Sequence, residues 1–239
     1  MSLSNLLKKI ADSEPGPETC ALFDFDGTVI SGYSATAFLK DQIARGELSP
    51  ADLIQLTQAA TRFGIGSLGF SALMAVHAQY LAGRSESEYI ANSERLFRRA
   101  IAKLVYPEAR QLIDAHRAKG HSIAIISSAT PYQVIPAAKD LGIDNVYATD
   151  LEVVDGYFTG SVVTPTCFGE GKVLAAEAFA EDHGGSVDRS FFYSDSTDDI
   201  ALLETVGYPV VLNGSKQLRV IAAEKRWPSA DFSSRGNAS

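Results

Sequence analysis

Two aspartates stand two residues apart in the stretch ALFDFDGTVI, Ala21 to Ile30, which is otherwise apolar enough for a buried β-strand. Side chains alternate across a strand, so Asp24 and Asp26 are expected on one face and Phe23 and Phe25 on the other. Two like charges this close together in an apolar core repel each other strongly. A bound cation removes that cost, and the pair therefore predicts a metal-assisted site.

Further polar side chains follow the strand patterns SIAII and FFYS, and one lysine opens a helix pattern. Some have a simpler structural explanation: Ser127 and Ser128 precede a helix, and the acids after FFYS suit a first helical turn. Lys172 is harder to explain, because a cation in a first turn opposes the helix dipole. In open parallel sheets, ligands bind at the carboxyl ends of the strands. The groups expected to converge there are Asp24, Asp26, Gly27, Thr28, Ser127, Ser128, Lys172, Asp195 and Ser196.

The ligand type indicates the cation. Aspartate oxygens without His or Cys suit a hard ion, and a sparse set that keeps several waters suits Mg²⁺ rather than Ca²⁺. A Mg²⁺ site beside a lysine and two hydroxyls suits a phosphate, whose oxygens need their charge neutralised as the transition state forms. Carboxylates act as nucleophiles in that chemistry and form an aspartyl-phosphate.

The elements that must position these groups alternate along most of the chain. Strand patterns at HSIAIIS, RSFFYS and YPVVLN are separated by helix patterns, some of which begin at proline or end at glycine. This alternation predicts an α/β fold with a Rossmann-like parallel sheet core, covered by helices on both faces. Residues 33–105 show no convincing strand pattern and predict an inserted all-helical cap. The expected core is therefore residues 1–32 and 106–239, in which 17–32 hold the first strand and its motif.

Two smaller elements are also expected. Leu3, Leu6, Leu7 and Ile10 fall at helical spacing and predict a short helix docked on the domain, with a partner or membrane-surface contact as the alternative. Asp155-Gly156 between two apolar runs predicts a hairpin turn.

Four segments, in order, resemble the motifs of the haloacid dehalogenase-like phosphohydrolases. They are DFDGT after an apolar strand, Ser127 after IAII, Lys172, and SDSTDD after FFY. The similarity extends to the hairpin, to CFGEGK and to a helical cap directly after the first motif, and it covers about residues 20–227. The chain looks most similar to the branch that contains phosphoserine phosphatase. The resemblance implies a Mg²⁺-dependent phosphomonoesterase that acts on a small phosphorylated metabolite.

The resemblance also implies a role for each site residue. Asp24 is the expected nucleophile, and Asp26 is the acid that protonates the leaving alkoxide and then deprotonates the attacking water. Lys172 neutralises the nucleophile and the phosphoryl group, and Ser127 holds a phosphate oxygen. The expected metal ligands are Asp24, Asp26 through its backbone carbonyl, Asp195, and Asp199, which holds the metal's waters or Lys172. The residues expected to contact phosphate or the rest of the substrate are Gly27, Ser128, Tyr33, Arg62 and Asp198.

The chain departs from that branch mainly on the substrate side. Ser194-Asp195-Ser196 stands where Gly-Asp-Gly is common, Ser128 stands in place of a glycine, and Asp198 in place of Asn or Thr. Tyr33 stands where phosphoserine phosphatases have a glutamate that reads the substrate. The catalytic set is complete, but the pocket is expected to favour a small alcohol phosphate other than phosphoserine.

Composition limits the remaining classes. A net charge of −8 over 239 residues argues against nucleic-acid binding, and no apolar run reaches the roughly 18 to 20 residues that cross a bilayer. The two cysteines, Cys20 and Cys167, suit a reducing cytoplasm. We therefore expect a cytoplasmic monomer or homodimer without an integral membrane segment. The open alternatives are a phosphotransferase that uses the same intermediate and a catalytically silent phosphate-binding regulatory protein.

Overall fold

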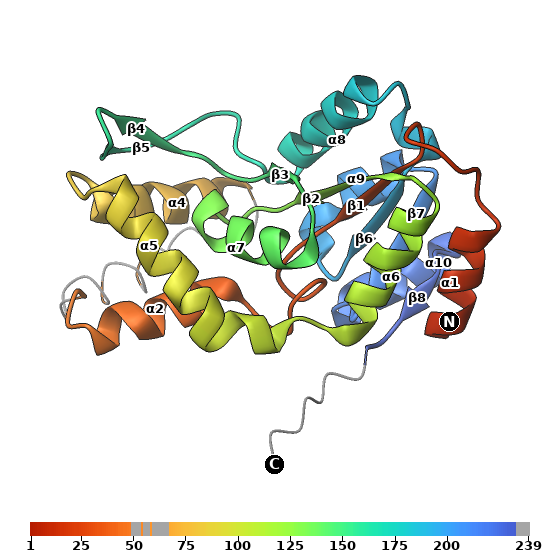
Figure 1. Ribbon diagram of the computed structural model, residues 1–239, viewed down its shortest axis with the longest axis horizontal. Helices are drawn as coiled ribbons and strands as arrows, with labels where there is room; N and C mark the ends of the chain where they lie inside the picture. The colour runs from red at the N-terminus through yellow and green to blue at the C-terminus, as the bar shows by residue number, and fades with distance from the viewer. Residues whose placement is uncertain (49–53, 55–57, 59–66, 233–239) are drawn as a thin grey trace, which may run out of the picture.

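A six-stranded parallel sheet forms the centre of the protein in the computed structural model, which describes residues 1–48, 54, 58 and 67–232 (Figure 1). The strand order is β3-β2-β1-β6-β7-β8, and every neighbouring pair is parallel. The strands are β1 (Cys20–Phe23), β2 (Ser122–Ile126), β3 (Asn145–Tyr147), β6 (Phe191–Ser194), β7 (Tyr208–Leu212) and β8 (Ser229–Ala230). The predicted α/β fold is confirmed, whereas the sequence did not predict the two short edge strands β3 and β8.

Side-chain alternation in the central strands divides the core into two clusters, one on each face of the sheet. Phe23 belongs to the cluster covered by α1, α6 and α7, whereas Leu22 belongs to the cluster covered by α8, α9 and α10. Every residue of β1 is buried, as a strand covered on both faces requires. The covering helices are α1 (Leu3–Ala11), α6 (Pro107–Ala118), α7 (Pro131–Leu141), α8 (Glu170–Asp182), α9 (Ile200–Thr205) and α10 (Lys216–Lys225).

The first helix, α1, docks on the domain as predicted. Leu6 and Ile10 are each only 1 % exposed, and they join the same cluster as Leu112 of α6. The apolar face of α1 thus packs against α6 of the same chain. In the part of the chain that the structure describes, no helix has the length and apolarity needed to span a membrane.

Helices make up the described part of the segment between β1 and α6. They are α2 (Ser34–Ala44), α4 (Ser67–Leu81), α5 (Glu86–Leu96), the π-helical turn η1 (Phe97–Ile101) and the 3₁₀ turn η2 (Ala102–Leu104). Figure 1 shows α2, α4 and α5 to one side of the molecule, away from the sheet. These helices lie within residues 33–105, the segment predicted to form the cap.

The predicted hairpin consists of β4 (Leu151–Val154) and β5 (Tyr157–Val162), with Asp155 and Gly156 both at positive φ in the turn. It packs beside α4 rather than on the main sheet (Figure 1), and Phe158 exchanges backbone hydrogen bonds with Gly83 and Arg84. The domain boundaries at residues 33 and 105 stay a prediction, because this hairpin packs with the helices of the insertion.

Candidate active site

The acidic residues cluster where the central strands end. Asp24 directly follows β1, Ser127 follows β2, and Asp195 follows β6, and the register pairs Phe23 with both Ile125 and Tyr193. The backbone N–H of Asp24 donates to the carbonyl of Tyr193 at 2.9 Å and extends this pairing by one residue. The expectation that Asp24 and Asp26 lie within the strand is wrong: β1 ends at Phe23, and the two acids lie in the turn beyond it.

Lys172 joins two of the carboxylates. Its Nζ lies 2.7 Å from Oδ1 of Asp24 and 2.8 Å from Oδ1 of Asp199, and all three side chains are less than one-tenth exposed. Burial lowers the pKa of Lys172, but Asp199 and Asp24 more than offset that effect and raise it, so the ammonium keeps its charge. The position of Lys172 in the first turn of α8 is thereby explained by its two acidic partners.

Asp199 is held from a second direction. Ser194, the last residue of β6, donates its hydroxyl to Oδ2 of Asp199 at 2.7 Å, and it accepts the N–H of Ser196 at 3.1 Å. Asp199 itself ends the 3₁₀ turn η4 (Thr197–Asp199) and is 2 % exposed. Ser194 thus has a positioning function that the sequence did not predict, although the departure from Gly-Asp-Gly at Ser194 marked the place.

Asp26 is bound by the start of the insertion. The backbone N–H and the hydroxyl of Ser34 both donate to its carboxylate, at 2.7 and 3.0 Å. Burial raises the pKa of Asp26 to about 6, and the two Ser34 hydrogen bonds oppose that rise. Asp26 can therefore both donate and accept a proton near neutral pH.

Gln133 extends this connection to α7. Its Nε2 donates to the Ser34 hydroxyl at 3.0 Å, while its Oε1 accepts both the N–H and the hydroxyl of Thr130 at 2.9 Å. Sequence analysis missed Gln133 and Ser34 as site residues. The available signal was TPYQ, Thr130 to Gln133, which has the spacing of a capping box.

Gly27 lets Asp195 approach the turn. A Cβ on Gly27 would lie 2.2 Å from Oδ2 of Asp195, and the φ of Gly27 is +79°. The turn is fixed by the N–H of Gly27, which donates to Gly32, and by the side chain of Asn213, which donates to the Gly27 carbonyl at 3.0 Å. Only glycine fits here, for reasons of both space and backbone conformation.

The predicted phosphate-binding hydroxyls lie beside this cluster in sequence and fold. Ser127 is 1 % exposed, and its Oγ accepts the N–H of Ala129 at 3.2 Å. Ser128 is half-buried in the same loop, which leads into α7. Asp198 lies in η4, where its N–H donates to Ser196, and burial followed by the charge of Asp199 raises its pKa.

The substrate-facing residues are less enclosed. Tyr33 precedes α2 and is 65 % exposed, and Asp195 together with burial raises the pKa of its hydroxyl. Arg62 lies outside the described residues. A contact across the site joins Phe70 of α4 to Phe168, whose rings stack with centroids 4.4 Å apart. Phe168 lies in the loop that leads to Lys172, so the insertion touches the segment that carries this lysine.

The carboxylates are suited to a cation beyond Lys172. Burial raises the pKa of Asp24 well above its ordinary value, Lys172 opposes that rise, and Asp199 and Asp195 add to it. Burial and Asp199 likewise raise the pKa of Asp195 to about 7. Side chains alone do not enclose an ion, since among the described residues no three or more His, Cys, Asp or Glu groups surround one metal position. An open set of this kind fits Mg²⁺, which keeps several waters and uses few carboxylates.

Comparison with known proteins agrees with this arrangement. The family model described as haloacid dehalogenase-like hydrolase matches residues 21–204. A phosphoserine phosphatase of Mycobacterium tuberculosis is 33% identical over 217 residues, which cover 89% of this chain and 70% of that protein. A histidinol-phosphatase of Neisseria meningitidis is 29% identical over 217 residues, which cover 89% of this chain and 98% of that protein. The crystal structure of a protein with unknown function from Bordetella pertussis Tohama I matches with a TM-score of 0.81 at 28% identity, over 90% of this chain and 99% of that one.

Proposed function

The chain belongs to the haloacid dehalogenase-like hydrolases, and we propose that it is a Mg²⁺-dependent phosphomonoesterase whose nucleophile is Asp24. Its reaction is the hydrolysis of a small phosphorylated metabolite through an aspartyl-phosphate.

The observation that carries this proposal is the state of the Asp24 carboxylate. Its Oδ1 accepts from Lys172, and among the described residues no protein donor is bonded to Oδ2. One oxygen is thus held in place while the other can attack phosphorus. Lys172 also stays close enough to neutralise charge on the phosphoryl group as it transfers.

Asp26 supplies the proton chemistry. With a pKa of about 6, it can protonate the leaving alkoxide when the aspartyl-phosphate forms. The resulting carboxylate can then remove a proton from the water that hydrolyses the intermediate. The two hydrogen bonds from Ser34 keep its oxygens oriented through both steps.

Asp24, Asp195 and the backbone carbonyl of Asp26 would hold Mg²⁺. The bound ion supplies charge neutralisation for the phosphate oxygens and keeps the buried carboxylates ionised. The side chains of Asp26 and Asp199 are bound by Ser34 and by Lys172, so their part in metal binding would be indirect.

The substrate is proposed to be a small alcohol phosphate. Two relatives are named as a phosphoserine phosphatase and a histidinol-phosphatase, and the substrates in these names share a primary alcohol and a nearby amine. Tyr33 offers a ring face and a neutral hydroxyl rather than a carboxylate for that amine. We therefore expect phosphoserine to be a poorer substrate than other small alcohol phosphates.

The test is hydrolysis of an aryl phosphate by the wild type, Asp24→Asn and Asp26→Asn, with intact-protein mass spectrometry after acid quenching. Wild type should release phosphate with Mg²⁺, lose activity in chelator and not regain it with Ca²⁺. Asp24→Asn should neither turn over nor gain a phosphoryl group. Asp26→Asn should still accept the group from this good leaving group but lose ~10²–10⁴-fold in turnover, so the phosphorylated protein accumulates.

Three results would contradict the proposal. Full activity in chelator would show that the reaction does not require a metal ion. Wild-type rates in Asp24→Asn would show that the reaction does not pass through an aspartyl-phosphate at Asp24. Phosphate recovered on an added alcohol rather than in solution would identify a phosphotransferase instead.

A further inference from the structure

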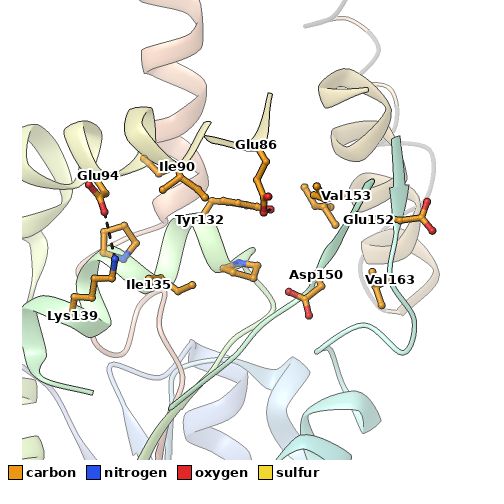
Figure 2. A pocket seen from close by; sticks show the side chains of 14 residues that line it. Glu86, Ile90, Glu94, Tyr132, Ile135, Lys139, Asp150, Glu152, Val153 and Val163 are labelled. Atoms are coloured by element: carbon orange, nitrogen blue, oxygen red, sulfur yellow. Dashed lines mark hydrogen bonds and ion pairs between the residues drawn. The ribbon is translucent and has the colours of Figure 1, made fainter. Parts of the chain in front are cut away.

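A groove separate from the carboxylate cluster lies between α5, α7 and the β4–β5 hairpin (Figure 2). Its volume is about 600 Å³, which is within the range of small-molecule sites. None of the residues assigned to phosphate chemistry lines it. The groove is therefore distinct from the carboxylate cluster.

Its walls expose apolar side chains that the core does not use. Ile90 of α5, Ile135 of α7 and Val163 after β5 are 42, 38 and 44 % exposed, and all three line the groove. The ring of Tyr132 lies between Ile90 and the hairpin, and Val163 lies on the hairpin side (Figure 2). Large apolar groups that gather around one hollow, rather than being scattered over the surface, favour an apolar ligand body.

The charges that line the groove are mostly negative. Of the residues lining it, the one cation is Lys139, whose Nζ lies 3.4 Å from Glu94. Three further carboxylates line it, Glu86, Asp150 and Glu152, of which Glu152 points away from the groove (Figure 2) and accepts the hydroxyl of Thr159. A ligand that balances this set carries positive charge.

Two of these carboxylates share one neighbour. Tyr132 donates its hydroxyl to Oε1 of Glu86 at 2.8 Å, and Figure 2 shows Asp150 on the hairpin side of the same ring. Burial, Glu86 and Asp150 all raise the pKa of the Tyr132 hydroxyl, so it stays neutral. A neutral aromatic side chain with two carboxylates on its hairpin side is a suitable environment for an ammonium or guanidinium group.

We propose that this groove binds a small organic cation, with its charged group between Glu86 and Asp150 and its apolar body against Ile90 and Ile135. A metal ion does not fit, because the apolar walls supply no ligands to complete its coordination. A bound cation joins α5 of the insertion to α7 of the sheet domain.

The groove also has a short connection to the active site. Tyr132 lines the groove, and the next residue, Gln133, donates to Ser34, which binds Asp26. A ligand that fixes the first turn of α7 therefore acts on a helix that already positions the catalytic acid. This makes the groove a candidate effector site.

Isothermal titration calorimetry on the full chain tests the proposal, with 2-phenylethylamine as the probe and 2-phenylethanol as its neutral match. Mg²⁺ and inorganic phosphate are present throughout to occupy the phosphate site. The amine should bind at least ~tenfold more tightly than the alcohol, and the same difference should persist without phosphate.

Two variants locate the binding. Ile135→Trp fills the groove and should abolish binding, whereas Val220→Trp, a matched change at an exposed position of α10, should leave it unchanged. Asp150→Asn should weaken the binding of the amine but not that of the alcohol. Circular dichroism establishes that each variant is folded.

Four results would each overturn the proposal. They are equal affinity for amine and alcohol, displacement by phosphate, unchanged binding in Ile135→Trp, and no binding at millimolar amine. The readout is binding, so it does not depend on phosphatase activity.

Discussion

Asp24 and Tyr33 are nine residues apart in the sequence, yet their surroundings differ sharply. Asp24 is 5 % exposed, and its carboxylate is bonded to a buried lysine, whereas Tyr33 is 65 % exposed at the start of α2. In the proposed reaction, the phosphate side of the site is set by strand ends whose backbones are already paired. The leaving-group side would be formed by the turn and the helices of the insertion.

This difference in burial corresponds to two different requirements, one for the phosphoryl group and one for the leaving group. Charge near phosphorus must be placed accurately in a region without water, and buried hydrogen bonds provide that placement. A leaving group needs only a complementary surface, which exposed side chains on a separate set of helices can supply. Variants on the phosphate side should therefore cost far more activity than variants on the leaving-group side.

The largest effect is expected for Lys172→Met. The change leaves Asp24 and Asp199 buried without their cation, which should lower the free energy of unfolding by about 3–5 kcal/mol and turnover by roughly 10³-fold. Lys225→Met is the control, because Lys225 forms an exposed ion pair with Glu204 worth at most about 1 kcal/mol. Urea unfolding and aryl phosphate hydrolysis measure the two quantities. If Lys172→Met and Lys225→Met lost similar amounts of stability and turnover, the buried ion pairs of Lys172 would be no more important than an exposed one.

Gly27→Ala should have the next largest effect. The new methyl group would lie only 2.2 Å from Oδ2 of Asp195, and displacing this carboxylate by about 1 Å can cost ~10²-fold in turnover. Gly32→Ala is a matched control at the other end of the same turn: its φ is +82°, but nothing lies within 4 Å of the added Cβ. Both variants should lose about 1–2 kcal/mol of stability from the left-handed conformation, and only Gly27→Ala should lose activity. Equal activity in the two variants would mean that Asp195 does not need its present position.

A buried histidine pair behind the sheet should make the core sensitive to acid. Tyr193 lies 2.8 Å from Nε2 of His116, the Nδ1 atoms of His116 and His121 lie 2.8 Å apart, and Nε2 of His121 lies 2.9 Å from the carbonyl of Glu14. With both rings neutral, every group in this series has a hydrogen-bond partner. The Tyr193 hydroxyl then donates to Nε2 of His116, Nδ1 of His116 donates to Nδ1 of His121, and Nε2 of His121 donates to the carbonyl of Glu14. A proton added to Nε2 of His116 turns that atom into a donor and leaves the Tyr193 hydroxyl hydrogen without its acceptor.

The pH dependence follows from the direction of that shift. Burial and His121 lower the pKa of His116 from 6.5 to about 3, so the unfolded chain binds more protons between those values. Stability is therefore full above pH 6.5 and falls as the pH decreases, by about 2 kcal/mol between pH 6.5 and 5 at about 1.4 kcal/mol per unit. Asp26 and Asp195, whose pKa values are raised, contribute the opposite slope. The difference between wild type and His116→Gln in urea unfolding cancels those contributions. Parallel pH profiles for wild type and His116→Gln would refute the assignment.

Sequence patterns predicted the parts of this protein that repeat a simple physical rule. The alternation of strand and helix predicted the sheet and its covering helices. The acids after β1 and β6 predicted a site at these strand ends, where the structure pairs Asp24 and Asp199 with Lys172, and their catalytic roles stay a prediction. The missed edge strands are too short for their periodicity to be distinct, and Asp24 appeared to lie within a strand because the apolar run continues past Phe23. Ser34 and Gln133 could not be assigned to the site because their contacts join segments 99 residues apart. The hydrogen bond from Gln133 to Ser34 depends on where the first turn of α7 lies relative to the start of α2, which no local pattern encodes.

The smallest effect is expected at Tyr33. If this site discriminates by charge, Tyr33→Glu should raise kcat/KM for phosphoserine relative to glycerol phosphate, because the new carboxylate can pair with the ammonium group. Since the position is 65 % exposed, water and salt screen that pair, and about 0.2–1 kcal/mol, or at most about fivefold, is expected. Added salt should reduce the gain, and Tyr33→Phe, which keeps the ring, should leave the ratio near that of wild type. The comparison includes phosphoethanolamine, phosphocholine and histidinol phosphate, so that a preference for a ring face appears as a gain for the quaternary ammonium. A wild type that already prefers phosphoserine by a large factor, with no improvement in Tyr33→Glu, would show that the leaving-group side is set by residues other than Tyr33.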